Sequence, residues 1–158
     1  MVKRSWRSRT RLDVGEDAVV SLAGASLLTT TARVLGLDRA LSKRLSTWTP
    51  LGATHDTGEI VLDVAVALAV GGDCPADVAL LRGQPRLFGT VASEPTVSRR
   101  IDALAGDVDR AGAALRAARA QARALRLKWA PVSVDRPLPV DIDATILVAH
   151  STGIGTGW

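Results

Sequence analysis

The amino-acid sequence predicts a mainly α-helical protein with one β-strand close to its last residue. Between positions 22 and 129, apolar residues recur every three or four positions between glycine and proline stops, which is the period of helices packed on a core. After three prolines the period changes to two over residues 140–148, as in a strand. A chain of 158 residues with 47% hydrophobic composition can fold around its own core. We expect a helical region at 1–130, then a linker and the first strand of another module at 131–158.

Two helices are expected in the first part of the helical region. The first spans about 22–35 and ends at Gly36, because glycine readily adopts the left-handed conformation that closes a helix. The second spans 38–45, with Asp38 as its N-cap. Its leucines recur every four residues and predict one buried stripe: Leu37, Leu41 and Leu45.

The next expected helix is the most apolar segment of the chain. Residues 48–57 carry a proline, a glycine and three threonines and are typical of a loop. Residues 58–70 follow as a helix whose only polar side chains are Glu59 and Asp63. A helix with so small a polar face is buried on most sides, so we expect it to be the central core helix.

Three further helices are expected before the linker. Gly71 and Gly72 stop the central helix, and Pro75 stands at the start of a short one that runs to Leu81. Residues 83–95 are expected to be a connection. Helices then follow at 96–104 and 107–129, the second of them rich in alanine and arginine, which favour helix formation.

The cations are distributed unevenly along the chain. The net charge is only +4, but five cations precede the first acid, and the range 110–128 holds six cations and no carboxylate. Such clusters favour a polyanionic partner such as DNA. Seventeen of the twenty cations are arginine, which suits bidentate phosphate contacts and equally fits a GC-rich coding sequence.

The cysteine count and hydropathy favour a cytoplasmic protein. Cys74 is the single cysteine, so neither an internal disulfide nor a paired-cysteine metal site can form. The apolar run at 60–70 includes Asp63 and is far shorter than the roughly 20 residues that cross a bilayer. We therefore expect no membrane partner.

Two carboxylates share one face of the predicted strand. Alternation aims Asp141 and Asp143 to one side and Ile142 to the other. Two carboxylates can contribute to a Mg²⁺ site only where other oxygen ligands converge on them. The alternative is an edge strand whose aspartates face solvent.

The helix at 96–104 begins with polar residues that suit DNA. Proline at its start is followed by four candidate contacts, which resemble those of a recognition helix in a helix-turn-helix: Thr96, Ser98, Arg99 and Arg100. Its hydroxyls and N-terminal dipole would meet phosphate, and an arginine would reach a base edge. The alternative is a capped surface helix that buries Val97, Ile101 and Leu104.

The long helix at 107–129 carries arginines at helical spacing. Offsets of three, seven and ten residues align Arg116, Arg119, Arg123 and Arg126 on one stripe, with an apolar stripe of Leu115, Ala118, Ala122 and Leu125 on another. Such a row can follow a DNA backbone, with affinity that depends on salt. A solvated arginine face is the alternative interpretation.

Several short segments, in this order and spacing, resemble the N-terminal half of bacterial insertion-sequence transposases of the DDE type. The resemblance covers about residues 20–151. Its segments are Gly71-Gly72-Asp73, Leu80-Leu81-Arg82, Leu87-Phe88-Gly89, Ala92-Ser93 with Thr96-Val97, and Asp141-Ile142-Asp143-Ala144-Thr145 followed by Ala149-His150-Ser151.

The resemblance implies DNA transposition by metal-dependent phosphoryl transfer in an RNase H-like catalytic domain. It implies that Asp143 is the first catalytic carboxylate and a Mg²⁺ ligand, with Asp141 a less favoured substitute, and that the DNA partner is a transposon end. Family members continue beyond the His-Ser pair with a domain that supplies a second Asp and a Glu, whereas here residues 152–158 are rich in glycine. We therefore expect a truncated transposase that is inactive alone. The alternative is a stand-alone DNA-binding module or repressor at transposon ends.

Overall fold

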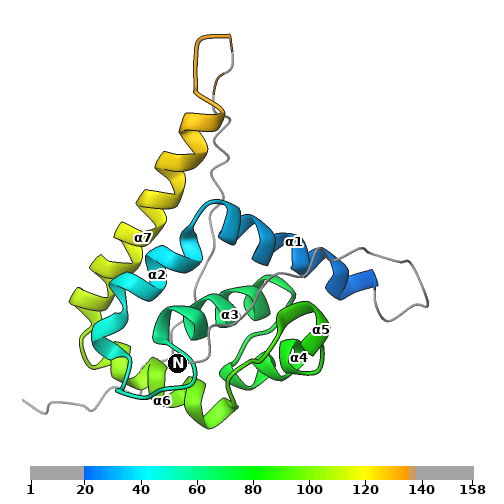
Figure 1. The fold of residues 1–158 in the computed structure, drawn as a ribbon, viewed down its shortest axis with the longest axis vertical. Helices are drawn as coiled ribbons and strands as arrows, with labels where there is room; N and C mark the ends of the chain where they lie inside the picture. The colour runs from blue at the N-terminus through cyan, green and yellow to red at the C-terminus, as the bar shows by residue number, and fades with distance from the viewer. Residues whose placement is uncertain (1–19, 136, 138–158) are drawn as a thin grey trace, which may run out of the picture.

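A computed structural model describes residues 20–135 and 137, and within these residues the chain folds into helices without a β-strand (Figure 1). The mainly α prediction is confirmed for this part of the chain. The predicted strand, with Asp141 and Asp143, lies outside the described residues. The helices are α1 (Val20–Val34), α2 (Leu37–Arg44), the 3₁₀ helix η1 (Ser46–Trp48), α3 (Thr57–Ala69), the 3₁₀ helix η2 (Pro75–Asp77), α4 (Val78–Arg82), α5 (Pro85–Phe88), α6 (Glu94–Ala105) and α7 (Val108–Trp129).

Helix α3 lies at the centre and contributes to two hydrophobic clusters. Its residues Ile60, Val66 and Ala67 are buried in the larger cluster, while Val61 and Leu62 pack against the smaller one. The larger cluster also contains Ala25, Val78, Leu81, Phe88, Val91, Ala92 and Val97. The smaller cluster joins α2 to α7 through Ala40, Leu41, Leu45 and Ala118. The prediction of a central core helix is confirmed, and the leucine stripe of α2 faces the core as expected.

A close approach of backbones sets the position of α2 on α3. A Cβ atom added to Gly58 would lie 2.2 Å from the Ser42 backbone nitrogen, so only glycine fits at this crossing. The carboxylate of Asp56 caps α3 by accepting the Glu59 N–H at 2.8 Å, and it also accepts the Ser42 hydroxyl at 3.0 Å. One aspartate thus starts α3 and ties it to α2.

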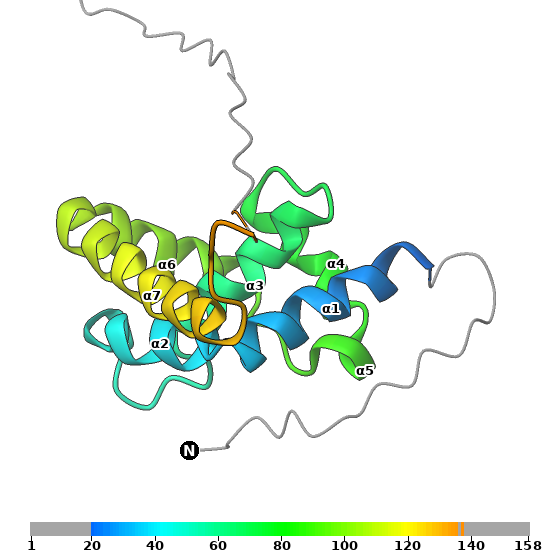
Figure 2. The same ribbon diagram turned by 90° about the horizontal axis from the view of Figure 1, so that it is seen from above.

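Helices α6 and α7 form a V. They meet at the turn formed by Gly106 and Asp107 and diverge from it in both ribbon views (Figures 1 and 2). The first turns of α7 pack on α2 and α6, whereas its last turns extend past the rest of the described body (Figure 1). The exposed side chains of Leu127 and Trp129 belong to this projecting end.

Several expectations about boundaries and burial were wrong. Gly36, with a φ of 65°, precedes α2 directly, so Asp38 lies in its first turn and is not its N-cap. The expected connection at 83–95 contains α5, because Pro85 starts a turn that delivers the fully buried Phe88 to the core.

Two core-facing assignments also need correction. Asp63 was expected on the polar face of α3 but is 3% exposed, since the elements that pack around α3 cover this position. The alternative interpretation of 96–104, a capped surface helix, would bury Ile101 with Val97 and Leu104, yet Ile101 is 37% exposed and belongs to neither cluster. The expected loop at 48–57 yields its first residue to η1 and its last to α3.

Candidate nucleic-acid interface

Polar side chains form hydrogen bonds with one another across the first turn of α6. Ser93 is the N-cap residue, and its hydroxyl lies 3.1 Å from that of Thr96. The exposed Arg99 donates to the Thr96 hydroxyl at 3.2 Å, and Ser98 is half-buried. Glu94 places a carboxylate in this first turn, where it suits the helix dipole but opposes an incoming phosphate. Arg99 therefore remains the best-placed cation on α6 for a contact with DNA.

The neighbouring Arg100 has a different environment. Its guanidinium is half-buried and donates to the backbone carbonyl of Trp48 at 3.3 Å. From the first turn of α7, Arg110 lies 5.2 Å from the centre of the Trp48 ring and donates to the Thr47 hydroxyl at 3.4 Å. We call Trp48, Arg100 and Arg110 the tryptophan clamp. It connects η1 to both α6 and α7, the two arms of the V.

The surroundings of α6 also differ from those of a recognition helix in a helix-turn-helix. Helix α5 stands between α4 and α6, so the two are not joined by the usual turn of about three or four residues. Helix α6 packs mainly on η1, η2, α3 and α7. The short helices η2 and α4 are therefore not joined to α6 as the first helix of a helix-turn-helix would be.

Helix α7 presents three faces. Ala111, Ala118 and Ala122 are buried, and the predicted apolar stripe is confirmed, with Leu115 and Leu125 partly buried beside them. The second face is the arginine row, which consists of the exposed Arg116, Arg119, Arg123 and Arg126. The third is formed by alanines that are exposed or partly exposed: Ala113, Ala117, Ala120 and Ala124.

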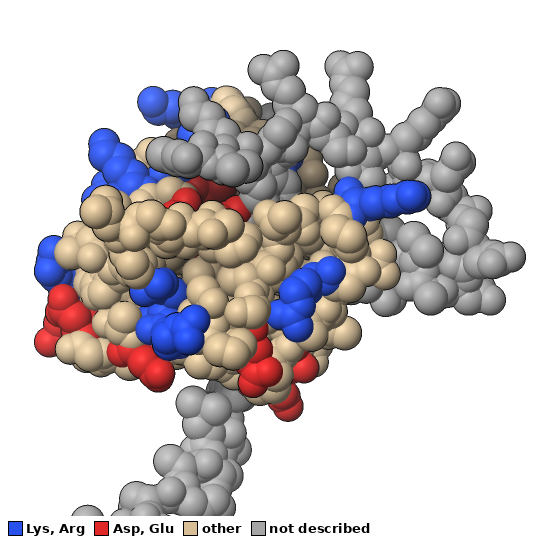
Figure 3. Space-filling model, turned by 60° about the horizontal axis from the view of Figure 1, so that its bottom comes forward, with Lys and Arg blue, Asp and Glu red and all other residues tan. Residues whose placement is uncertain are grey.

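The arginine row makes no ion pair with any other residue that the structure describes. Within α7 the sequence offers no local partner, because no Asp or Glu occurs from residue 110 to 134, and the described fold brings no carboxylate from another element to the row. On the underside of the molecule, by contrast, cations form separate groups with carboxylates between them (Figure 3). The projecting end of α7 extends away from α6 (Figure 1).

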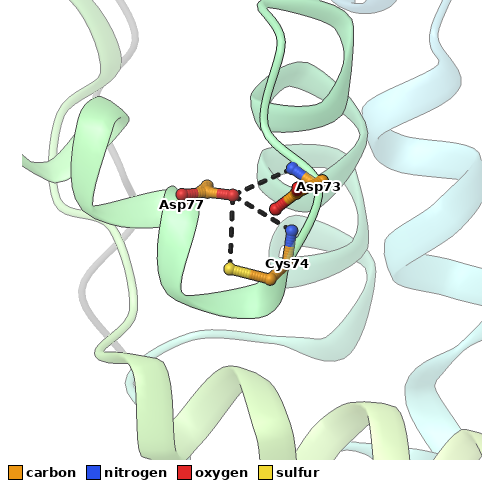
Figure 4. Close-up of side chains that lie close together, drawn as sticks. All are labelled: Asp73, Cys74 and Asp77. Carbon is orange, nitrogen blue, oxygen red and sulfur yellow. Dashed lines mark hydrogen bonds between the residues drawn. The ribbon is translucent and has the colours of Figure 1, made fainter.

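The turn between α3 and η2 brings together three groups that can bind metals. Ligand atoms of Asp73, Cys74 and Asp77 lie within 4.8 Å of one another (Figure 4). One oxygen of Asp77 already accepts the N–H groups of Asp73 at 2.8 Å and Cys74 at 3.0 Å, and the Cys74 thiol at 3.3 Å.

These hydrogen bonds identify the turn as a helix cap. The two backbone N–H donors lower the pKa of Asp77, and the hydrogen bond to Asp77 raises the pKa of the Cys74 thiol. Gly71 has a φ of 100°, and a Cβ on Gly72 would lie 2.8 Å from the Cβ of Asp77. Both glycines are thus required by the turn itself.

Comparison with known proteins decides the family. The model of the family described as transposase DDE domain group 1 matches residues 4–158. The chain belongs to this family. No curated protein and no solved structure matches the chain. Membership in the DDE transposase family supports a role in transposition, as the sequence resemblance implied.

The segments that resemble this transposase family have structural roles in the helical region. Gly71-Gly72-Asp73 forms the capped turn, Leu81 and Phe88 are fully buried, and Ser93 starts α6. The catalytic segment with Asp141 and Asp143 lies outside the described residues. No helix of the described range is long and apolar enough to span a membrane.

Sequence reasoning missed the tryptophan clamp. Arg100 was grouped with Arg99 because adjacent arginines at a helix start suit DNA. Trp48 gave no local signal, since its partners lie more than 50 positions further along the chain. Arg100 is half-buried and Arg99 is exposed only because η1 packs against the V.

Proposed function

We propose that this member of the transposase family binds transposon-end DNA through its helical region and contributes one carboxylate to a metal-dependent catalytic centre. The observation that carries the proposal is the family match, which extends over residues 4–158. Exposed cations support the DNA contact, with Arg99 on α6 and the arginine row on α7 as its main residues. Thr96 shapes the first turn of α6 through its contacts with Ser93 and Arg99, the half-buried Ser98 is a lesser candidate for a DNA contact, and Arg100 acts through the tryptophan clamp.

Asp143 is the proposed carboxylate, and Asp141 is its less favoured substitute. In the proposal, residues 140–148 form the first strand of an RNase H-like sheet, on which both aspartates face the same side. Magnesium, when bound, stabilises the attacking and leaving oxygens of an in-line phosphoryl transfer. Asp143 would hold the ion through a carboxylate oxygen, the kind of ligand that Mg²⁺ prefers.

Residues 1–158 are proposed to bind DNA without cleaving it. Two carboxylates on one strand face are too few to form a complete site, because Mg²⁺ requires near-octahedral oxygen coordination. The proposed activity of this chain is thus recognition, and strand transfer requires further carboxylates from elsewhere.

One observation favours a second candidate function, that of a stand-alone DNA-binding module or repressor at transposon ends. Both hydrophobic clusters are formed within residues 25–118. A helical region that buries its own core can fold and bind DNA without a catalytic domain. Such a module would compete with an active transposase for the same ends.

A binding and cleavage assay on the same DNA tests the proposal. A labelled duplex that carries the terminal inverted repeat is titrated with the 158-residue chain at about 50 and 200 mM salt, and it is then incubated with MgCl₂. We expect salt-sensitive binding and no nicking. Absence of binding above background at low salt would refute DNA recognition. Magnesium-dependent nicking that Asp143→Ala abolishes would refute the proposal that the chain is inactive alone.

A further inference from the structure

We infer that the arginine row of α7 binds the phosphate backbone of double-stranded DNA and does not read bases. This inference rests on the proposed DNA binding, and it assigns to α7 a form of nucleic acid and a mode of contact. Of the three faces of α7 only one is buried, which leaves the arginine row and the alanine face open to a ligand.

The spacing of the row matches the spacing of phosphates along one DNA strand. At 3.6 residues per turn, its four arginines fall within an arc of about 80°. From Arg116 to Arg126 the helix rises by about 15 Å. Phosphates of one strand follow one another every 3.4 Å or so along the axis of the duplex, so this length faces four or five of them. Four guanidiniums in a row can each meet one.

The charge of α7 and the small side chains beside its arginine row also suit a close approach to a duplex. No described carboxylate neutralises the row, so its guanidiniums can replace the counterions that surround DNA. The adjacent alanine face carries methyl groups only, which lets the helix axis come near the backbone. The last turns of α7 project beyond the body, where neighbouring helices do not block them (Figure 1).

The placement of aromatic residues favours a duplex over a single strand as the ligand. Surfaces that bind single strands without sequence preference stack bases on aromatic rings placed along a cationic groove. In α7 the one aromatic residue is Trp129, at the end of the helix and beyond the row. Trp48 is already covered by Arg110, and Phe88 is fully buried.

The test compares variants of the row with a charge-matched control. One variant replaces all four arginines of the row by alanine, a second replaces them by lysine, and the control replaces four exposed cations elsewhere: Arg39, Lys43, Arg44 and Arg86. Affinity is measured from about 50 to 200 mM salt for a transposon-end duplex, a scrambled duplex and a single strand. Circular dichroism melts establish that each variant is folded.

We expect the alanine variant to lose affinity for both duplexes equally, on the order of 100-fold. The salt slope, which is the slope of log affinity against log salt concentration, should be shallower by about three to four. The lysine variant should keep most of the slope, because the slope follows the number of charges brought to the phosphates and both side chains carry one positive charge. The control should change the slope by less than about one.

Other outcomes overturn the inference and leave the proposed function standing, provided that the unaltered chain binds DNA. An equal effect of the control would assign the loss to net charge alone. A loss confined to the transposon-end duplex would indicate base reading, and a salt slope that lysine does not restore would show that charge on the row does not make the contact. Preference for the single strand, or a dimer in sedimentation that the row substitutions dissociate, would assign α7 to another partner. If the unaltered chain binds no DNA, the proposed function itself fails.

Discussion

Two groups of arginines on the arms of one V differ in what surrounds them. Arg100 and Arg110 lie near the turn, against Trp48, and hold η1 in place. The arginine row lies further along α7, is exposed, and has no described carboxylate partner. The residue type is the same, so the difference comes from what the fold places beside each guanidinium.

The clamp forms because η1 ends there. A helix end leaves backbone carbonyls without intrahelical donors, and a buried carbonyl needs a partner. Arg100 supplies the donor for Trp48, and the indole ring offers its face to Arg110. Along the row of α7 the described residues provide neither a carbonyl nor a ring as a partner, so these cations remain available to a ligand.

The largest effect on stability should come from Trp48→Ala. The substitution removes a half-buried ring that packs on the smaller cluster and removes the partner of Arg110. We expect the free energy of unfolding to fall by about 2–3 kcal/mol, somewhat less than for a fully buried tryptophan. Urea denaturation measures it. A change below about 0.5 kcal/mol, as at ordinary surface positions, would show that the clamp contributes little.

Arg100→Ala and Arg99→Ala form a matched pair on adjacent positions. Loss of a half-buried hydrogen bond from a charged donor should cost about 1–2 kcal/mol of unfolding free energy at Arg100. At the exposed Arg99 the cost should stay within about 0.5 kcal/mol. DNA affinity should show the opposite order, with the larger loss at Arg99. Equal effects on both measurements would remove the distinction between the two arginines.

Arg110→Gln should have a smaller effect on stability. Glutamine keeps a donor near Thr47 but lacks the charge that interacts with the Trp48 ring, which is worth about 0.5–1 kcal/mol at an exposed site. The difference should be measurable in urea melts. Its salt slope for DNA binding should match that of the unaltered chain, in contrast to any substitution in the row.

The smallest effect on stability is expected at Asp77, which, like the clamp arginines, already has hydrogen-bond partners within the fold. Hydrogen bonds from two backbone N–H groups hold the pKa of Asp77 below its ordinary value of 3.8. A lowered pKa in the folded state means that the stabilisation is present above the ordinary value and lost as pH falls through the folded value. Asp77→Asn should therefore be less stable than the unaltered chain at neutral pH, with a gap that narrows at acidic pH. A gap that is constant from neutral to acidic pH would contradict this.

Helix positions were predictable from the sequence where apolar periodicity and glycine stops agreed. Helix α3, the leucine stripe of α2 and the extent of α7 followed from such local patterns. The burial of Asp63, the exposure of Ile101 and the clamp were not predictable, because each depends on elements distant in the sequence. The arginine row was visible as a pattern, but its lack of carboxylate neighbours needed the fold.

Direct observation of the arginine side chains tests the distinction between the two groups. In a chain of 158 residues, the Nε–Hε signals of individual arginines can be assigned by nuclear magnetic resonance with single Arg→Lys variants. On addition of duplex DNA, we expect the signals of Arg116, Arg119, Arg123 and Arg126 to shift and those of Arg100 and Arg110 to stay in place. Shifts at the clamp with an unchanged row would contradict the account.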